Sequence, residues 1–250
     1  MTAKEKFLSS KSFSVYYGKG CVKELAKFDI AIIEPLAQDV GTIIAMQKEG
    51  ILVFAYISVM EVHPEQAEFN LHKNDLLKIE GESVQNKEFH TFYTDLRCEK
   101  WMMNLYRKVE IYLTEYGCDG LFLDTMSNLE DARIPVNTKY LLIESAVAFL
   151  EKIKKDFNQP LLIQNNGTGL LIHYTKGSID GVCWENPSIR LGITGRVNKV
   201  ITKKLNDLRT EINMKIFILT EESGQKSKII RYAKRNNYLY YDAPKNYLQI

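Results

Sequence analysis

Short apolar stretches, rich in β-branched and aromatic residues, recur along the whole chain and alternate with longer stretches that have the spacing of amphipathic helices. We predict strands at residues 14–17, 30–33, 51–57, 120–123, 161–164, 180–184, 215–219 and 238–241. We predict helices between most of them, at residues 22–28, 40–48, 99–116, 138–157, 197–212 and 226–235. The pattern indicates a repeated β-α unit.

Most of the predicted strands are apolar on both faces, which is typical of parallel strands covered by helices on one side and by packed side chains on the other. Eight such strands favour a closed (β/α)8 TIM barrel, and a doubly wound open sheet is the alternative. The chain of 250 residues is long enough for one barrel, so we expect a single domain over residues 1–250. One connection, of about 40 residues after the third strand, has the length of a lid or cover.

Composition and charge narrow the possible partners. The chain has 45% hydrophobic and 26% charged residues, as an ordinary globular protein does. Its formal net charge of +2 is too small for the broad positive field of a nucleic-acid-binding protein, so we expect no nucleic-acid partner. No apolar run reaches the roughly 18 residues of a membrane span, so we expect no membrane partner either. The first residues lack a secretion signal, which predicts a cytoplasmic protein, or a secreted one if an export signal was removed.

Polar residues just after the strands are the candidates for function, because the loops at the carboxyl ends of barrel strands build the active site. Acidic residues follow six of the eight predicted strands, and an asparagine pair follows the fifth. These residues are Glu34, Glu61, Asp124, Asn165, Asn166, Glu185, Glu221, Glu222 and Asp242. In a nearly neutral chain they predict an acidic mouth that attracts cations. The alternative for each acid is that it caps the helix that follows it.

Asp124 and Glu185 are the strongest candidates for chemistry. Each directly follows a very apolar strand, so we expect a fixed geometry and a raised pKa for both carboxyl groups. Glycoside hydrolases use two carboxylates on nearby strands, one as acid/base and the other as nucleophile or water activator. Aromatic side chains near the strand ends suit the apolar faces of sugars, although core packing explains some of them equally well. They are Tyr16, Tyr17, Tyr56, Trp184, Tyr240 and Tyr241.

Several strand-end motifs, in this order along the chain, resemble those of the endo-α-1,4-polygalactosaminidase-like glycoside hydrolases. The motifs are Tyr16-Tyr17-Gly18, residues 55–58 followed by Glu61, residues 95–97 with Trp101, and residues 117–125, 165–167 and 180–185. The resemblance implies a TIM barrel that acts on α-1,4-linked galactosamine polymers, with a catalytic Asp after the fourth strand and a catalytic Glu after the sixth. Here these residues are Asp124 and Glu185. Two positions depart from the family pattern: Met60 replaces a small residue, and Ser127 replaces an acidic one.

We therefore predict a glycoside hydrolase that needs no cofactor and no metal, with Asp124 as nucleophile and Glu185 as general acid/base. The predicted substrate is a poly- or oligosaccharide, in particular a cationic amino sugar that complements the acidic mouth. The predicted substrate-binding residues are Tyr16, Glu34, Tyr56, Glu61, Asn165, Asn166, Trp184, Glu221 and Asp242.

Two other functions stay open. The first is a Mg²⁺-dependent lyase or isomerase in which Glu61, Asp124 and Glu185 bind the metal ion. Against it, no Lys follows a predicted strand where it could serve as the base. The second is a barrel that binds glycans without cleaving them, and the presence of both Asp124 and Glu185 argues against it.

Overall fold

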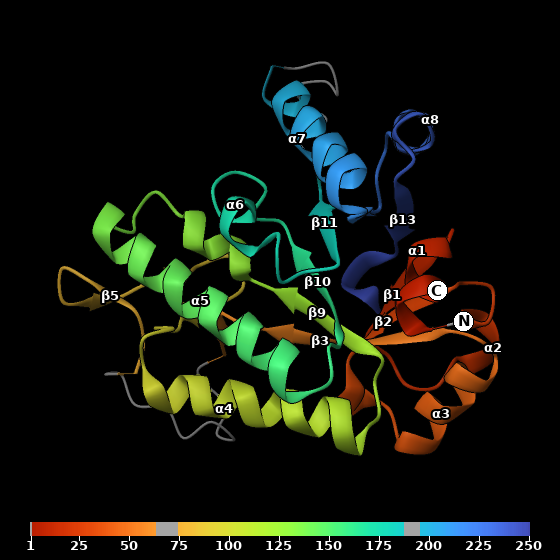
Figure 1. Cartoon of the computed structure of the whole chain (residues 1–250), viewed down its shortest axis with the longest axis horizontal. Coiled ribbons are helices and arrows are strands. Elements are labelled where there is room, and N and C mark those ends of the chain that lie inside the picture. The colour runs from red at the N-terminus through yellow and green to blue at the C-terminus, as the bar shows by residue number, and fades with distance from the viewer. Residues whose placement is uncertain (1, 64–74, 188–195) are drawn as a thin grey trace.

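The computed structural model describes residues 2–63, 75–187 and 196–250, and its centre is a sheet of eight parallel strands (Figure 1). The strands follow one another around the sheet as β1 (Phe13–Tyr16), β2 (Ile30–Ile33), β3 (Leu52–Ser58), β9 (Gly120–Asp124), β10 (Leu161–Asn165), β11 (Gly181–Glu185), β12 (Lys215–Glu221) and β13 (Leu239–Ala243). Each pairs with the next in parallel, and β13 comes back into contact with β1. The predicted TIM barrel is confirmed, and the open-sheet alternative is wrong.

Helices cover the barrel, and all of them except the first lie in connections between its strands. They are α1 (Ala3–Ser9), α2 (Val22–Leu25), α3 (Val40–Lys48), α4 (Glu99–Glu110), α5 (Val136–Asp156), α6 (Ile172–Thr175), α7 (Arg196–Ile212) and α8 (Lys226–Asn236). A π-helical turn, Ile111–Glu115, continues α4, and 3-10 turns cover Pro35–Ala37, Met126–Glu130 and Lys245–Tyr247. All six predicted helices are present. Among the helices in the described ranges, none is both long and apolar enough to cross a membrane.

The strands bury two separate layers of apolar side chains, because successive residues of a strand point to opposite faces. One layer lies outside the barrel, under the helices, and the other fills its interior. The interior layer consists of Phe7, Phe13, Val15, Ile30, Ile32, Leu52, Phe54, Phe122, Leu161, Ile163, Cys183, Phe217, Leu219, Tyr241 and Ala243. Phe7 is the member that comes from a helix, α1, and its ring packs against those of Phe54 (5.6 Å) and Phe217 (5.9 Å). The helix α1 thereby covers the amino-terminal end of the barrel.

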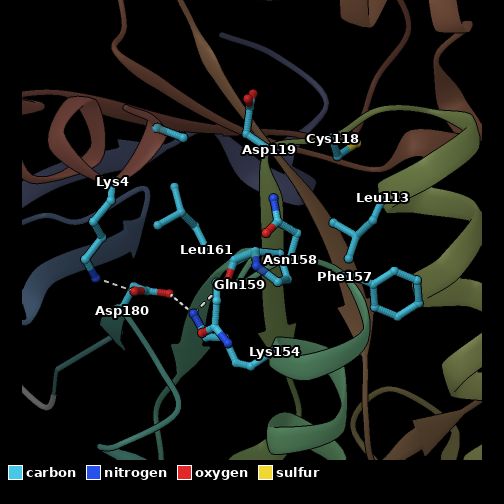
Figure 2. A pocket seen from close by; sticks show the side chains of 12 residues that line it. Lys4, Leu113, Cys118, Asp119, Lys154, Phe157, Asn158, Gln159, Leu161 and Asp180 are labelled. Carbon is cyan, nitrogen blue, oxygen red and sulfur yellow. Dashed lines mark hydrogen bonds and ion pairs between the residues drawn. The ribbon is translucent and has the colours of Figure 1, made fainter. Parts of the chain in front are cut away.

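A cavity of about 420 Å³ lies at this amino-terminal end, where Figure 2 shows Lys4 and Lys154 reaching Asp180 from two sides. Asp180 precedes β11, forms ion pairs with Lys4 of α1 and with Lys154 of α5 (2.6 Å), and accepts a hydrogen bond from the backbone N–H of Leu162 (2.8 Å). The carboxylate is thus satisfied by protein groups. This network ties α1 and α5 to the barrel, at the end opposite the predicted active site.

The long connection after β3 contains small sheets of its own. Strands β4 (Glu61–Val62), β8 (Thr91–Tyr93) and β7 (Gln85–Asn86) form an antiparallel sheet, and β5 (Lys78–Ile79) pairs with β6 (Glu82–Ser83). The sequence predicts the length of this connection but not its strands. Strands of two or three residues are too short to display an alternating pattern.

Candidate active site

The inward-facing side chains at the carboxyl ends of the strands meet at one end of the barrel. Each follows an interior apolar residue by two positions, so it points to the same side of the sheet. In strand order these side chains are Tyr17, Glu34, Tyr56, Asp124, Asn165, Glu185 and Glu221. Most of the candidate acids therefore converge here, together with an amide and two phenols.

Asp124 and Glu185 lie on either side of Asn165, because β10 runs between β9 and β11. The side-chain amide of Asn165 donates to Oδ1 of Asp124 (2.8 Å) and to Oε2 of Glu185 (2.7 Å). Two bonds of these lengths from one nitrogen hold the two oxygens no more than about 5.5 Å apart. Asn165 is therefore a bridge between the two carboxylates.

The other oxygen of each carboxylate accepts a hydrogen bond from a tyrosine hydroxyl. Tyr56, in β3, donates to Oδ2 of Asp124 (2.9 Å), and Tyr247, in the last 3-10 turn, donates to Oε1 of Glu185 (2.7 Å). The ring of Tyr17 packs between them, with centroids 4.9 Å from Tyr56 and 5.2 Å from Tyr247. All four oxygens of the pair thus have a protein donor.

Burial raises the pKa of both carboxyl groups above their ordinary values. Hydrogen bonds oppose this effect: Asp124 receives them from Asn165, from the backbone of Thr125 and from Tyr56, and Glu185 receives them from Asn165 and Tyr247. The negative charge of Asp124 raises the pKa of Glu185 further. Burial and the neighbouring carboxylates raise the pKa of Tyr56 and Tyr247, so both phenols remain donors. Burial and the neighbouring negative charge thus both oppose the ionisation of Glu185.

Glu61 is close to this group, but protein donors already engage its carboxylate. The side chain is buried and accepts hydrogen bonds from Asn86 (3.0 Å), Asn128 (2.6 Å) and Thr91. It ties the small antiparallel sheet to the loop after β9. The metal-dependent alternative requires Glu61 to share an ion with Asp124 and Glu185. In the described part of the chain, no three His, Cys, Asp or Glu side chains cluster as metal ligands do.

Three more predicted contacts lie at the same end of the barrel and serve as supports. Glu34 accepts hydrogen bonds from the hydroxyl of Tyr112 (3.2 Å) and the backbone of Leu36 (3.3 Å). The amide oxygen of Asn166 accepts from the backbone N–H of Glu185 (2.9 Å). Glu221 accepts from the backbone N–H of Asn246 (2.7 Å), beside Tyr247.

Tyr16, Trp184 and Asp242 are not part of this group, because each occupies the outward-facing position of its strand. Tyr16 is buried and donates to the backbone carbonyl of Lys19 (3.0 Å). Trp184 packs in the outer layer, with its ring 6.4 Å from that of Tyr232. Asp242 accepts hydrogen bonds from Thr220 (2.5 Å) and from the backbone of Ser223 (3.0 Å), near the start of α8.

Tyr17 and Tyr247 are absent from the predicted substrate-binding residues, although Tyr17 is one of the aromatic residues noted near the strand ends. Tyr17 has a signal in the sequence, because counting by two from Phe13 and Val15 leads to Tyr17 and past Tyr16. Tyr247 has none, since it lies in a short turn beyond the last strand, where no periodic pattern indicates its direction.

A (β/α)8 barrel with a pair of carboxylates at the carboxyl ends of its strands is an arrangement that glycoside hydrolases use. Residues 2–188 match the model of glycoside-hydrolase family GH114. The chain therefore belongs to family GH114, and the resemblance carried by its strand-end motifs is confirmed.

Solved structures agree with this assignment at the level of the fold. The glycoside hydrolase domain of PelA from Pseudomonas aeruginosa is 17% identical, with a TM-score of 0.78 over 97% of both chains. Ega3 from Aspergillus fumigatus, solved in complex with galactosamine, is 10% identical, with a TM-score of 0.69 over 95% of this chain and 92% of that one. The α-galactosidase TtGalA from Thermus thermophilus is 12% identical, with a TM-score of 0.63 over 96% of this chain and 60% of that one. No curated protein sequence matches the chain significantly.

Proposed function

We propose that this GH114 member hydrolyses an α-1,4-linked galactosamine polymer with retention of anomeric configuration, using Asp124 as nucleophile and Glu185 as general acid/base. The Asn165 bridge is the observation that carries the proposal. It limits the nearest oxygens of the two carboxylates to about 5.5 Å. Retaining glycosidases have carboxyl groups about 5–5.5 Å apart, whereas inverting enzymes need roughly 6.5–9.5 Å to admit a water molecule.

The surroundings of the two carboxyl groups support this division of roles. Asp124 has three sources of donors to its ionised form and Glu185 has two, and the negative charge of Asp124 raises the pKa of Glu185, which supports Asp124 as the ionised nucleophile and Glu185 as the acid. In the first step Asp124 attacks the anomeric carbon while Glu185 protonates the leaving glycosidic oxygen. In the second step the Glu185 carboxylate takes a proton from water, which attacks the same carbon and releases Asp124.

The charge of the site supports an amino sugar. Asp124, Glu185 and Glu221 form no ion pair with a basic side chain in the described part of the chain. Their negative charge is therefore available to attract the ammonium groups of a de-acetylated galactosamine polymer. Membership of GH114 and the galactosamine bound by the similar fold of Ega3 are consistent with this choice.

Release of reducing ends from a panel of amino-sugar and neutral polysaccharides tests the proposal. The wild type should cleave the galactosamine polymer, and Asp124→Asn and Glu185→Gln should each lower kcat by several orders of magnitude. Asp242→Asn is the matched control, because Asp242 also follows a strand but faces outward, and it should keep wild-type activity. Near-full activity of either pair variant would remove that residue from the mechanism.

A further inference from the structure

Tyr56 and Tyr247 each donate a hydrogen bond to one carboxylate of the pair, and the steps of the proposed reaction assign no role to either hydroxyl. We infer that they are positioning residues, each of which holds one carboxylate in place and stabilises its ionised form, Tyr56 for Asp124 and Tyr247 for Glu185. The inference deepens the proposed function and rests on it for the roles of the two carboxylates. It extends the site to a segment outside residues 2–188, over which the chain matches the family.

The two hydroxyls differ from the other donors because each serves a single carboxylate. Tyr56 bonds Asp124 (2.9 Å) and Tyr247 bonds Glu185 (2.7 Å), whereas the amide of Asn165 bonds both. Loss of Asn165 would therefore disturb the whole pair. Loss of one hydroxyl removes a donor from one member only.

The last 3-10 turn is built to hold Tyr247 in place. The backbone carbonyl of Tyr247 accepts a hydrogen bond from the N–H of Tyr17 (2.7 Å), and Glu221 accepts one from the N–H of Asn246 (2.7 Å). Asn246 and Tyr247 have φ values of 61° and 56°. This left-handed conformation is unfavourable for a bulky residue such as tyrosine and persists only where the surroundings enforce it. The turn therefore joins β1 to the end of β12 and delivers a phenol to Glu185.

The hydroxyls of Tyr56 and Tyr247 stabilise ionised carboxylates in surroundings that hold no positive charge among the groups named below. Asp124 is influenced by Asn165, Thr125, Tyr56 and Glu61, and Glu185 by Asn165, Asp124, Tyr247 and Glu221. Tyr17 and Cys183 are close enough to sense both carboxylates. All of these groups are acidic or neutral. Removing a donor to an ionised carboxylate in such surroundings raises the pKa of that carboxyl group.

The pH dependence of kcat/KM in Tyr56→Phe and Tyr247→Phe tests the inference. In the wild type the acidic limb reports ionisation of Asp124 and the alkaline limb reports deprotonation of Glu185. Tyr56→Phe should move the acidic limb to higher pH by about one unit and leave the alkaline limb in place. Tyr247→Phe should do the reverse, moving only the alkaline limb to higher pH.

Tyr106→Phe is the matched control, because Tyr106 donates to the carboxylate of Asp156 (2.7 Å) on the outer surface. It should leave both limbs unchanged. The inference is overturned if neither limb moves in the site variants, if both variants move the same limb, or if the control moves either limb. If Tyr56→Phe moves only the alkaline limb and Tyr247→Phe moves only the acidic limb, each tyrosine still acts on one carboxylate. The roles given to Asp124 and Glu185 are then overturned.

A measurement without substrate separates this inference from the proposed function. Carboxyl-carbon NMR titration of Tyr247→Phe should show a higher pKa for Glu185 and little change for Asp124, whether or not the polymer is cleaved. An unchanged titration of Glu185 would overturn the inference even if the enzyme is active. If the phenylalanine variant does not fold, 3-fluorotyrosine at position 247 retains the phenol and makes its hydroxyl a stronger hydrogen-bond donor. It should move the titration of Glu185 to lower pH, and no movement would again overturn the inference.

Discussion

Thr125, Asn166 and Asn186 have a feature in common: each directly follows an inward-facing side chain at a strand end, and each has a positive φ, of 61°, 54° and 44°. Their side chains then accept backbone N–H groups from a neighbouring strand end. Thr125 accepts from Met60 (2.8 Å), and Asn166 accepts from Glu185 (2.9 Å). The residue after each of these inward-facing side chains thus fixes the position of another part of the candidate site.

Asn166 provides a prediction about this support. Asn166→Ala removes the acceptor and leaves a residue with a Cβ at φ 54°, whereas Asn166→Gly removes the acceptor alone. We expect both variants to be less stable than the wild type, and Ala to cost about 1 kcal/mol more than Gly in the free energy of unfolding. Urea denaturation measures the difference. Equal stability of the two variants would mean that the left-handed conformation carries no cost.

Asp124 should lower the stability of the folded protein at neutral pH. Burial raises the pKa of its carboxyl group, so the folded state binds this proton more tightly than the unfolded chain does. Stability therefore falls as pH rises between the two values, by about 1.4 kcal/mol in total for each unit by which the pKa is raised. Asp124→Asn should resist urea better than the wild type at pH 7, and the advantage should shrink as pH falls toward about 4. A variant that is less stable than the wild type at pH 7 would contradict this sign.

At this scale, the sequence does not reliably predict which face of a strand a side chain points to, or which residues outside the strands and helices reach the site. The positions of Asp124 and Glu185 at the carboxyl ends of inner strands can be predicted, because each ends an unbroken apolar run. Tyr16 and Trp184 each lie one residue away from an inward position, and that single step turns a side chain from the barrel interior to the helix layer. Tyr247 belongs to no periodic element, so only the folded chain reveals it.

Among the elements, α1 is the one that closes the amino-terminal end of the barrel. Phe7 is fully buried among interior rings, whereas the neighbouring Leu8 is 36% exposed. Phe7→Ala should lower the free energy of unfolding by about 3–5 kcal/mol, because it leaves a cavity in a packed core. Leu8→Ala is the matched control and should change it by about 0.5 kcal/mol or less. Similar losses in the two variants would show that α1 is not part of the barrel core.

The sequence predicts the continuous apolar strands, the longer helices and, among the described α-helices of seven residues or fewer, only α2. All eight barrel strands are predicted to within two residues at each end, because strands buried on both faces are continuous apolar runs. The helix α1 has seven residues and α6 has four, which is two turns or fewer. Such segments, like the short strands after β3, take their structure from the contacts they make.

At the scale of the whole molecule, clusters of opposite charge lie toward the two ends of the barrel. Acidic side chains gather at the carboxyl ends of the strands, around Asp124 and Glu185. A cavity of about 500 Å³ near the starts of β12 and β13 is lined by basic residues, among them Lys11, Arg209 and Lys215. Although the formal net charge is only +2, the charged side chains are unevenly distributed, and this distribution can orient a cationic polymer toward the acidic end.

Salt dependence tests this long-range attraction. Raising the ionic strength from 0.01 M to 0.15 M shortens the Debye length from about 30 Å to about 8 Å. Activity on a de-acetylated, cationic galactosamine polymer should therefore fall with added salt. Activity on the N-acetylated, neutral polymer should be lower at low salt and almost independent of salt. If salt leaves cleavage of the cationic polymer untouched, the acidic end does not recognise charge.

Time-resolved proton NMR of an α-1,4-galactosamine oligomer during cleavage by the wild type tests the central claim most directly. With the two bridged oxygens of Asp124 and Glu185 held about 5.5 Å apart or closer by Asn165, the first product should carry the α anomeric configuration and convert to the equilibrium mixture only later. A first product with the β configuration would contradict the double displacement at this pair, and an oligomer that stays intact would contradict the substrate.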